Sequence, residues 1–237
     1  MVTKSPQSGI LEVIVYSEAD AVAAADGGAD RLEVISHYES GGLTPLIELV
    51  RGIAAAVCMP LRAMVRQSES YVVRDRGEID ELCAAARALA DIGIDGIVIG
   101  FLQKGPGGDC CIDHQLLERV LRCAPNIKAT FHRAFEELTD PLAAIAELKR
   151  HPQIDRILTS GGSDSWASKL DHLTAWQRGA RPEIELIIGG GTDEETVRLL
   201  KPAGIREFHV GRAVRAEMKT DGPILIGRVR ALAELVH

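Results

Sequence analysis

The segment Gly28-Ala29-Asp30-Arg31-Leu32-Glu33-Val34-Ile35 decides the fold, because its first half has counterparts along the chain. Each counterpart ends a helical pattern and begins an apolar run: Gly93-Ile94-Asp95-Gly96, Gln153-Ile154-Asp155-Arg156 and Gly204-Ile205-Arg206-Glu207. Glycine suits the left-handed turn that ends a helix. The recurrence therefore predicts a strand–helix–strand–helix unit that is used four times.

Short apolar runs alternate with alanine- and leucine-rich segments of helical periodicity. The runs are Leu11–Val15, Leu32–Ile35, Leu61–Val65, Gly96–Ile99, Ala129–Phe131, Arg156–Leu158, Ile184–Ile188 and Glu207–Val210. Strands that alternate with helices in this way are typical of βαβ units around a parallel sheet. Eight units with no leftover sequence predict an α/β fold, a single (β/α)8 TIM barrel. Thr44-Pro45 and Asp140-Pro141 each predict a capped helix start.

Length and composition limit the classes of protein that this chain can represent. Its 237 residues match a single barrel, so we expect one domain over residues 10–237 after a flexible N-terminus, residues 1–9. The net charge of −7 and the 4% aromatic content argue against nucleic-acid binding, which typically requires basic patches and aromatic side chains for base stacking. The first residues do not form a signal peptide, and no run of about 18 apolar residues could span a membrane. We therefore expect neither nucleic acid nor a membrane as a partner.

The cysteines indicate a reducing compartment. Their number is odd and their spacing is not that of a disulfide framework: Cys58, Cys83, Cys110, Cys111 and Cys123. Free thiols are typical of the cytoplasm. The sequence therefore predicts a cytoplasmic protein.

Strand periodicity directs several charged side chains into the barrel. Glu12 shares a face with Ile14, and Glu33 shares a face with Ile35, while their apolar neighbours face the helices. By the same rule Arg62, Lys128 and Glu207 also point inward. Two interpretations stay open for these groups: a structural layer of ion pairs, or acid–base chemistry in a deep site.

Other polar residues come late in their strands or in the loops that follow, where the active sites of barrel enzymes form. We take Glu12, Glu33 and His132 as catalytic candidates. The glycine-rich loops near the end of the chain let backbone amides approach an anion, although they could also simply turn the chain. The candidates for ligand binding are Arg66, Arg133, Ser160, Gly161, Gly190, Gly191, His209, Gly211 and Arg212. Nucleotide-binding fingerprints are absent.

A separate segment, Gly105 to Cys111, is rich in glycine and ends in two adjacent cysteines, with His114 close behind. Cys110, Cys111 and His114 are the candidate ligands for a soft ion such as Cu(I). Adjacent cysteines chelate awkwardly, and no second pair has the spacing of a zinc site. The alternative interpretation is a mobile lid over the mouth of the barrel.

Together the motifs resemble those of the CutC family of copper homeostasis proteins. The matching stretches are Leu11-Glu12-Val13, Gly27 to Glu33, Gly41 to Pro45, Asp95 to Val98, Thr130 to Phe135, Arg156 to Gly162 and Gly189 to Gly191. The resemblance implies a cytoplasmic TIM barrel that forms a homo-oligomer, with a dimer favoured, and copper as the one cofactor to consider. Family members implicated in Cu(I) binding carry cysteine where this chain has Ile14 and Ile35, which offer no metal ligand.

Two functional hypotheses follow. The first is a CutC-like barrel whose mouth binds a small molecule that bears phosphate or carboxylate, with lyase or isomerase chemistry as the enzyme class to test. The alternative is a Cu(I)-binding homeostasis protein.

Overall fold

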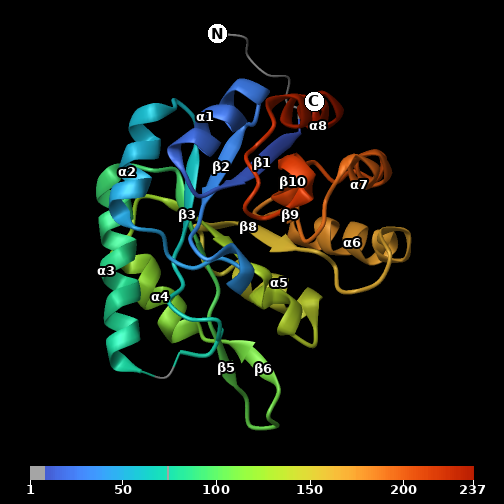
Figure 1. Ribbon diagram of the computed structural model, residues 1–237. Helices are drawn as coiled ribbons and strands as arrows, with labels where there is room; N and C mark the ends of the chain where they lie inside the picture. The colour runs from blue at the N-terminus through green and yellow to red at the C-terminus, as the bar shows by residue number, and fades with distance from the viewer. Residues whose placement is uncertain (1–8, 74) are drawn as a thin grey trace.

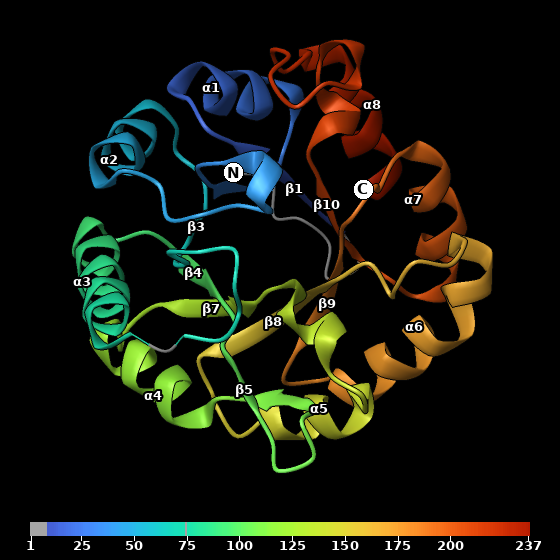
Figure 2. The same ribbon diagram turned by 60° about the horizontal axis from the view of Figure 1, so that its bottom comes forward.

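The computed structural model describes residues 9–73 and 75–237, and its strands form a closed ring surrounded by helices (Figures 1 and 2). Around the ring the order is β1-β10-β9-β8-β7-β4-β3-β2, with every neighbouring pair parallel. The strands are β1 (Ile10–Val15), β2 (Arg31–Val34), β3 (Leu61–Met64), β4 (Gly96–Ile99), β7 (Lys128–Phe131), β8 (Ile154–Thr159), β9 (Glu185–Ile188) and β10 (Glu207–Val210). The predicted TIM barrel is confirmed. The flexible segment expected at 1–9 lies, apart from Gly9, outside the described residues.

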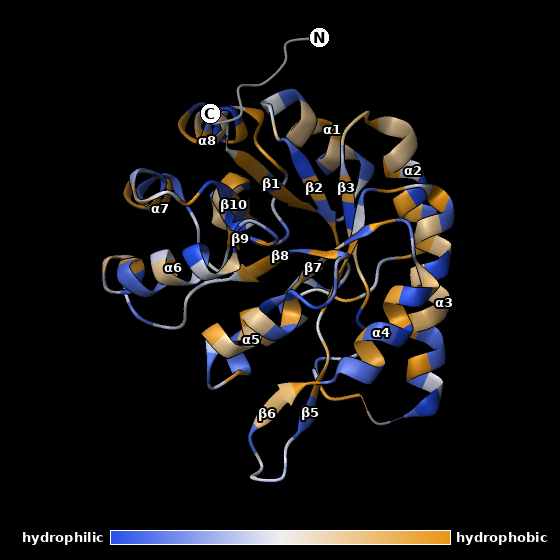
Figure 3. Cartoon of the chain, turned by 180° about the vertical axis from the view of Figure 1, so that it is seen from behind, coloured by the Kyte–Doolittle hydropathy of each residue, from blue (hydrophilic) through white to orange (hydrophobic). Residues whose placement is uncertain are grey.

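The helices cover the outside of the ring. They are α1 (Glu18–Gly27), α2 (Ile47–Ala56), α3 (Arg76–Ile92), α4 (His114–Cys123), α5 (Pro141–Leu148), α6 (Trp166–Ala180), α7 (Glu194–Leu200) and α8 (Ile226–Val236). Figure 3 shows hydrophilic and hydrophobic residues alternating along α3 and α4, as expected where one helix face meets the sheet and the other meets solvent. Within the described chain, no helix is both long enough and apolar enough to cross a membrane.

Glycines of the recurring module end the helices as expected. Gly28, Gly93 and Gly204 have φ angles of 93°, 82° and 94°, in the left-handed region that favours glycine. The fourth module begins with Gln153, whose side-chain amide instead donates to the carbonyl oxygens of Ala124 and Ile127. The repeat therefore marks the turn before each even-numbered barrel strand. Three of these turns contain a left-handed glycine, and the fourth is held by the side-chain hydrogen bonds of Gln153.

The two predicted helix starts have different outcomes. Asp140 is the N-cap of α5, and its carboxylate accepts from the backbone amides of Leu142 and Ala143. The prediction for Thr44 is wrong, because α2 begins at Ile47 and the Thr44 hydroxyl donates to the backbone oxygen of Arg66. Thr44 therefore ties two loops together at the carboxyl ends of the strands.

Alternation along the strands separates two apolar regions. Leu11, Val13, Leu32 and Val34 are fully buried in the main core between the sheet and the helices. A smaller cluster contains the alternate residues, inside the ring: Ile14, Ile35, Met64 and Val98. The predicted orientation of β1 and β2 is thus confirmed, and Glu12 and Glu33 point inward.

An antiparallel hairpin, β5 (Leu102–Lys104) and β6 (Cys110–Ile112), projects beyond the ring after β4 (Figure 1). It contains the segment for which a lid was the alternative prediction. None of the hairpin residues lines the pocket at the mouth of the barrel. The glycines instead form the tip of a hairpin, so the lid interpretation is wrong for this structure.

Candidate functional site

An ion-pair network fills the interior of the barrel below its mouth. The strand register places Glu12 beside both Arg31 on β2 and His209 on β10. The Arg31 guanidinium donates to Glu12, and also to Glu207 over 2.9 Å. Arg156 donates to both oxygens of Glu207, over 2.6 and 3.0 Å. Glu12 and Glu207, both directed inward by strand periodicity, are thus paired with arginines of β2 and β8 inside the ring.

The same network continues toward the amino ends of the strands. Arg62 is fully buried and donates to both carboxylate oxygens of Asp155, over 2.8 and 2.9 Å, and to Asp95 over 3.2 Å. Lys128, which was expected inside, is exposed and donates to a backbone oxygen at Pro152. Lys128 is paired with Gly96 but is the first residue of β7, so its long side chain lies at the amino-terminal rim of the ring and reaches solvent.

His209 joins this network to the pocket above it. Its Nδ1 lies 2.8 Å from Glu12 Oε1, and its Nε2 lies 3.3 Å from Glu33 Oε2. Burial opposes a charge on His209, but the carboxylates of Glu33 and Glu12 together raise its pKa. Burial likewise opposes a charge on Glu12, but Arg31 and His209 lower the pKa of this carboxyl well below its usual range. Glu12 is therefore an ionised partner that orients His209.

Glu33 behaves differently from Glu12, although both are 2% exposed. Burial raises the pKa of Glu33 to about 7, and the negative charge of Glu12 adds to this effect while His209 opposes it. The Glu33 Oε1 atom is buried without a hydrogen-bond partner among the described residues. Glu33 is thus a carboxyl group that can hold or release a proton near neutral pH.

The mouth of the barrel contains a pocket of about 580 Å³, a size that suits a small molecule. Most of the predicted site residues line it: Glu33, Arg66, His132, Arg133, Gly190, Gly191, His209, Gly211 and Arg212. Glu12 lies in the network below and does not line the pocket. Ser160 and Gly161 do not line it either. The structure therefore brings together most residues of the predicted site.

His132 follows the end of β7 directly and is 3% exposed. Its Nδ1 accepts a hydrogen bond from the Ala134 backbone N–H over 3.1 Å. Burial, together with the charge of Arg66, lowers the pKa of His132 to about 3. The Nε2 atom is buried and has no partner among the described residues. His132 is therefore a neutral imidazole beside the pocket.

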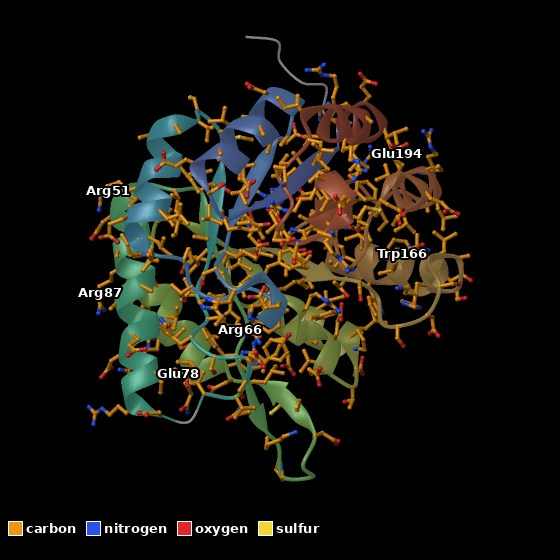
Figure 4. All side chains as sticks on the ribbon, in the orientation of Figure 1. Arg51, Arg66, Glu78, Arg87, Trp166 and Glu194 are labelled. Carbon is orange, nitrogen blue, oxygen red and sulfur yellow. The ribbon has the colours of Figure 1, made fainter. Side chains whose placement is uncertain are left out.

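Arg66 lies in the loop after β3 and is 7% exposed. Figure 4 places it near the middle of the molecule, whereas Arg51 and Arg87 extend outward from α2 and α3. Its guanidinium donates to the backbone oxygens of Ser40 and Glu69 and stacks on the Tyr71 ring at 4.6 Å. No carboxylate pairs with it in the described part of the chain, and its Nε has no partner there. Burial accordingly lowers its pKa.

Two of the predicted anion donors, Ser160 and Arg133, are already engaged by a carboxylate of the protein. Glu136 accepts from the backbone N–H of Ser160 over 2.5 Å and from Arg133 over 2.8 Å. It also partly neutralises Arg133, so Arg66 and Arg212 are the arginines of the pocket lining that lack a carboxylate partner among the described residues.

The cysteine-rich segment does not assemble a metal centre. Cys110 Sγ lies 3.2 Å from the Lys104 ammonium, whereas Cys111 Sγ donates to the Gln103 carbonyl oxygen. His114 instead contacts His151 and Glu147, over 2.9 and 3.0 Å. Among the described residues, a set of three potential metal ligands within 4.8 Å of one another occurs at Glu12, Glu33 and His209. Those atoms are oxygen and nitrogen, which do not favour Cu(I).

The family role in copper handling can be tested against the donor atoms in the pocket. Ile14 and Ile35, at the positions where the resembling proteins carry cysteine, belong to the small apolar cluster inside the ring. Met64 supplies a thioether there, but no thiolate lines the described pocket. The residues present do not fit a Cu(I) site of the cysteine type, since Cu(I) favours sulfur ligands in combination.

Several pocket residues were missed by sequence reasoning. Tyr38, Tyr71 and Leu158 line the pocket beside the predicted residues. Arg31 was missed as the central cation of the interior network, although it shares the inward face with Glu33 by strand alternation. Tyr38 begins a single 3-10 turn and Tyr71 lies in a loop, and neither segment has a periodicity that could have identified them.

Comparisons with known proteins agree on one family. A sequence model described as the CutC family matches residues 9–214. The human copper homeostasis protein cutC homolog is 34% identical over 202 residues, which cover 84% of this chain and 72% of the human protein. A family protein CutC from Treponema denticola is 31% identical over 208 residues, which cover 87% of this chain and 82% of that protein.

Solved structures agree on the fold. A CutC structure from Streptococcus agalactiae superposes with a TM-score of 0.77 at 21% identity and covers 85% of this chain and 97% of its own. Thiamine phosphate pyrophosphorylase from Pyrococcus furiosus superposes with a TM-score of 0.61 at 15% identity and covers 97% of this chain and 96% of its own. At these identities both structures support the barrel architecture alone.

Proposed function

This chain belongs to the CutC family, and from that premise we propose that it binds a small molecule bearing phosphate or carboxylate in the pocket at the mouth of its barrel. The observation that carries the proposal is the state of Arg66. This guanidinium is almost fully buried, contacts the pocket and has no carboxylate partner among the described residues. A buried, unpaired charge is costly, and an anionic ligand would offset that cost.

Other groups around the pocket support the same ligand class. Arg212 lines the pocket, and no described carboxylate pairs with it. The interior arginines differ, because Arg31, Arg62 and Arg156 are each bonded to carboxylates. An unpaired guanidinium can form paired hydrogen bonds with a phosphate or carboxylate group. Arg66 and Arg212 are therefore the cations of the pocket available to a ligand.

Calorimetric titration with inorganic phosphate and with glycolate tests the proposal. We expect saturable binding to the wild-type protein and a loss of about tenfold or more in Arg66→Met, because the substitution removes a charge-assisted hydrogen bond. Arg51→Met is the matched control, since Arg51 is exposed on α2 and lies outside the pocket. Equal affinity of Arg66→Met and the wild type, or no saturable binding of either anion, would contradict the proposal.

The proposal also includes a cytoplasmic location and a homodimer, both supported by the family resemblance. Light scattering after size-exclusion chromatography measures the mass in solution. A mass of one chain, 25.5 kDa, would contradict the dimer.

A further inference from the structure

We propose that the pocket transfers a proton at a carbon atom next to a carbonyl group, with Glu33 as the group that moves the proton and His132 as the hydrogen-bond donor to the carbonyl oxygen. The inference rests on the proposed function, because its substrate is a small carbonyl compound whose anionic group binds Arg66. It goes further by assigning a reaction class and two distinct chemical roles.

The tautomer of His132 is set by its backbone contact. Nδ1 accepts from the Ala134 N–H, so in the neutral ring the proton is on Nε2. Nε2 is buried, has no partner among the described residues and belongs to a side chain that lines the pocket. This N–H group is therefore a donor available to a ligand.

Close packing holds the His132 ring in place. A Cβ atom on Gly100, at the end of β4, would lie only 2.5 Å from the ring atoms Cε1 and Nδ1. The Tyr71 ring also packs against it, with its centroid 5.2 Å from that of His132. A donor that is fixed before the ligand arrives needs no reorganisation during the reaction, which is how buried donors stabilise a developing oxyanion.

The charge state of His132 suits this role. Burial and the neighbouring Arg66 keep the ring neutral at ordinary pH, since they lower its pKa to about 3. A neutral imidazole donates a hydrogen bond to an enolate oxygen without adding a second buried cation beside Arg66. Arg66 thus binds the fixed negative charge of the substrate, and His132 stabilises the negative charge that develops on the carbonyl oxygen during the reaction.

Glu33 has the complementary properties of a base. Its Oε1 is buried and without a partner in the described chain, while Oε2 lies 3.3 Å from His209 Nε2. Burial first, then the charge of Glu12, raises its pKa to about 7. A carboxylate with such a pKa accepts a proton from carbon more readily than an ordinary glutamate would, and it can also return that proton at neutral pH.

The barrel separates these two groups. Glu33 is on β2 and His132 follows β7, and β3 and β4 lie between those strands in the ring. Both side chains line the same pocket of about 580 Å³. A substrate bound between them could present its C–H bond to one group and its carbonyl oxygen to the other.

The proposed step is balanced without any other reactant. Glu33 Oε1 forms a bond to the proton of the carbon atom, and the electrons of the broken C–H bond form a carbon–carbon double bond. The π electrons of the carbonyl group move to its oxygen, which accepts a hydrogen bond from His132 Nε2–H. Glu33 then returns the proton to the same carbon, which gives exchange, or to the adjacent one, which gives isomerisation.

The first test needs no substrate. Nitrogen NMR of the protein labelled at histidine reports which ring nitrogen carries the proton. We expect His132 to carry it on Nε2, with Nδ1 unprotonated, throughout pH 5–8 (the range expected for a ring whose pKa is about 3). A proton on Nδ1, or titration of the ring near its ordinary pKa of about 6.5, would overturn the inference.

The second test measures the chemistry. Dihydroxyacetone phosphate, pyruvate and 2-oxoglutarate are incubated with the protein in D2O, and deuterium incorporation beside the carbonyl group is followed by proton NMR. We expect exchange of at least one of them, reduced about 100-fold or more in Glu33→Gln and about 10-fold or more in His132→Gln. Glu48→Gln, on the exposed side of α2, is the matched control and should exchange at the wild-type rate.

The outcomes separate this inference from the proposed function. If no probe exchanges faster than with Glu33→Gln, the proton-transfer assignment is wrong. If no probe exchanges but phosphate or glycolate still binds in an Arg66-dependent way, the proposed anion site is supported and the proton-transfer reaction is not. Circular dichroism of each variant establishes that it is folded, and the NMR test on the wild-type protein decides the His132 assignment even if a variant does not fold.

Discussion

Glu12 and His209 are register partners on β1 and β10, and their side chains are joined over 2.8 Å across the seam where the barrel closes. The two residues are 197 positions apart in the chain, so only ring closure brings them together. Through His209, the interior ion pairs contact Glu33 at the floor of the pocket. The stability of the barrel and the properties of its site are therefore linked through one imidazole.

Removal of the Glu12 charge should destabilise the fold strongly. Glu12→Gln leaves Arg31 and His209 without their shared ionised partner, and the loss of one member of a buried pair costs about 3–5 kcal/mol. Urea denaturation measures the free energy of unfolding. The exposed Glu48→Gln should differ from the wild type by less than about 0.5 kcal/mol. Similar losses in both variants would argue against the network.

Removal of the Glu33 charge should stabilise the folded protein, and only at high pH. Because the native pKa of Glu33 is raised from 4.5 to about 7, the native state binds a proton that the unfolded state has released. This group therefore makes the wild-type protein less stable as the pH rises from about 4.5 through 7. We expect Glu33→Gln to be about 1–3 kcal/mol more stable than the wild type at pH 8, with little difference at pH 4.5. Denaturation at the two pH values measures this, and a difference independent of pH would contradict the assignment.

The close approach of α1 and α8 depends on Gly27. A Cβ atom there would lie 2.4 Å from the Val229 Cβ, so Gly27→Ala should cost about 1–3 kcal/mol through overpacking. Gly227 on α8 is the matched control, because its added Cβ would meet no atom within 4 Å. Gly227→Ala should be neutral or stabilising by up to about 1 kcal/mol. Thermal unfolding of both variants tests the prediction, which fails if Gly27→Ala is as stable as the wild type.

Copper affinity should depend on the residues that replace the cysteines of the resembling proteins. Ile14 and Ile35 belong to one apolar cluster with Met64 beside the pocket. The double variant Ile14→Cys with Ile35→Cys would place two thiols next to a thioether, a donor set that Cu(I) favours. Competition with a chromogenic Cu(I) chelator should reveal a tight site in this variant.

The wild-type protein is the reference in that measurement. It should compete much more weakly, and Cys110→Ser with Cys111→Ser should leave its affinity unchanged. Tight binding that disappears in the latter variant would instead support the copper hypothesis built on the hairpin cysteines.

Much of the architecture follows from local patterns. The alternation in Leu11-Glu12-Val13-Ile14 predicts which side chains face the helices, because successive residues of a strand point to opposite faces. Most of the predicted mouth residues also proved to line the pocket, since the carboxyl ends of all strands in a parallel barrel meet at one face. Lys128 and Thr44 were predicted wrongly because the environment of a residue at the edge of a strand or helix depends on where that element begins, which local patterns do not fix.

The sequence by itself determined the barrel, the inward direction of Glu12 and Glu33, and the end of the barrel at which polar residues gather, because backbone periodicity and connection rules act over short stretches of chain. Only the tertiary structure decided the chemical state of each group. Pairing with Arg31 keeps Glu12 ionised while burial raises the pKa of Glu33 to about 7, although both lie in the same Leu-Glu-Val-Ile pattern. The physical reason is that charge and proton affinity depend on neighbours across the ring, and ring closure brings those neighbours from distant parts of the chain.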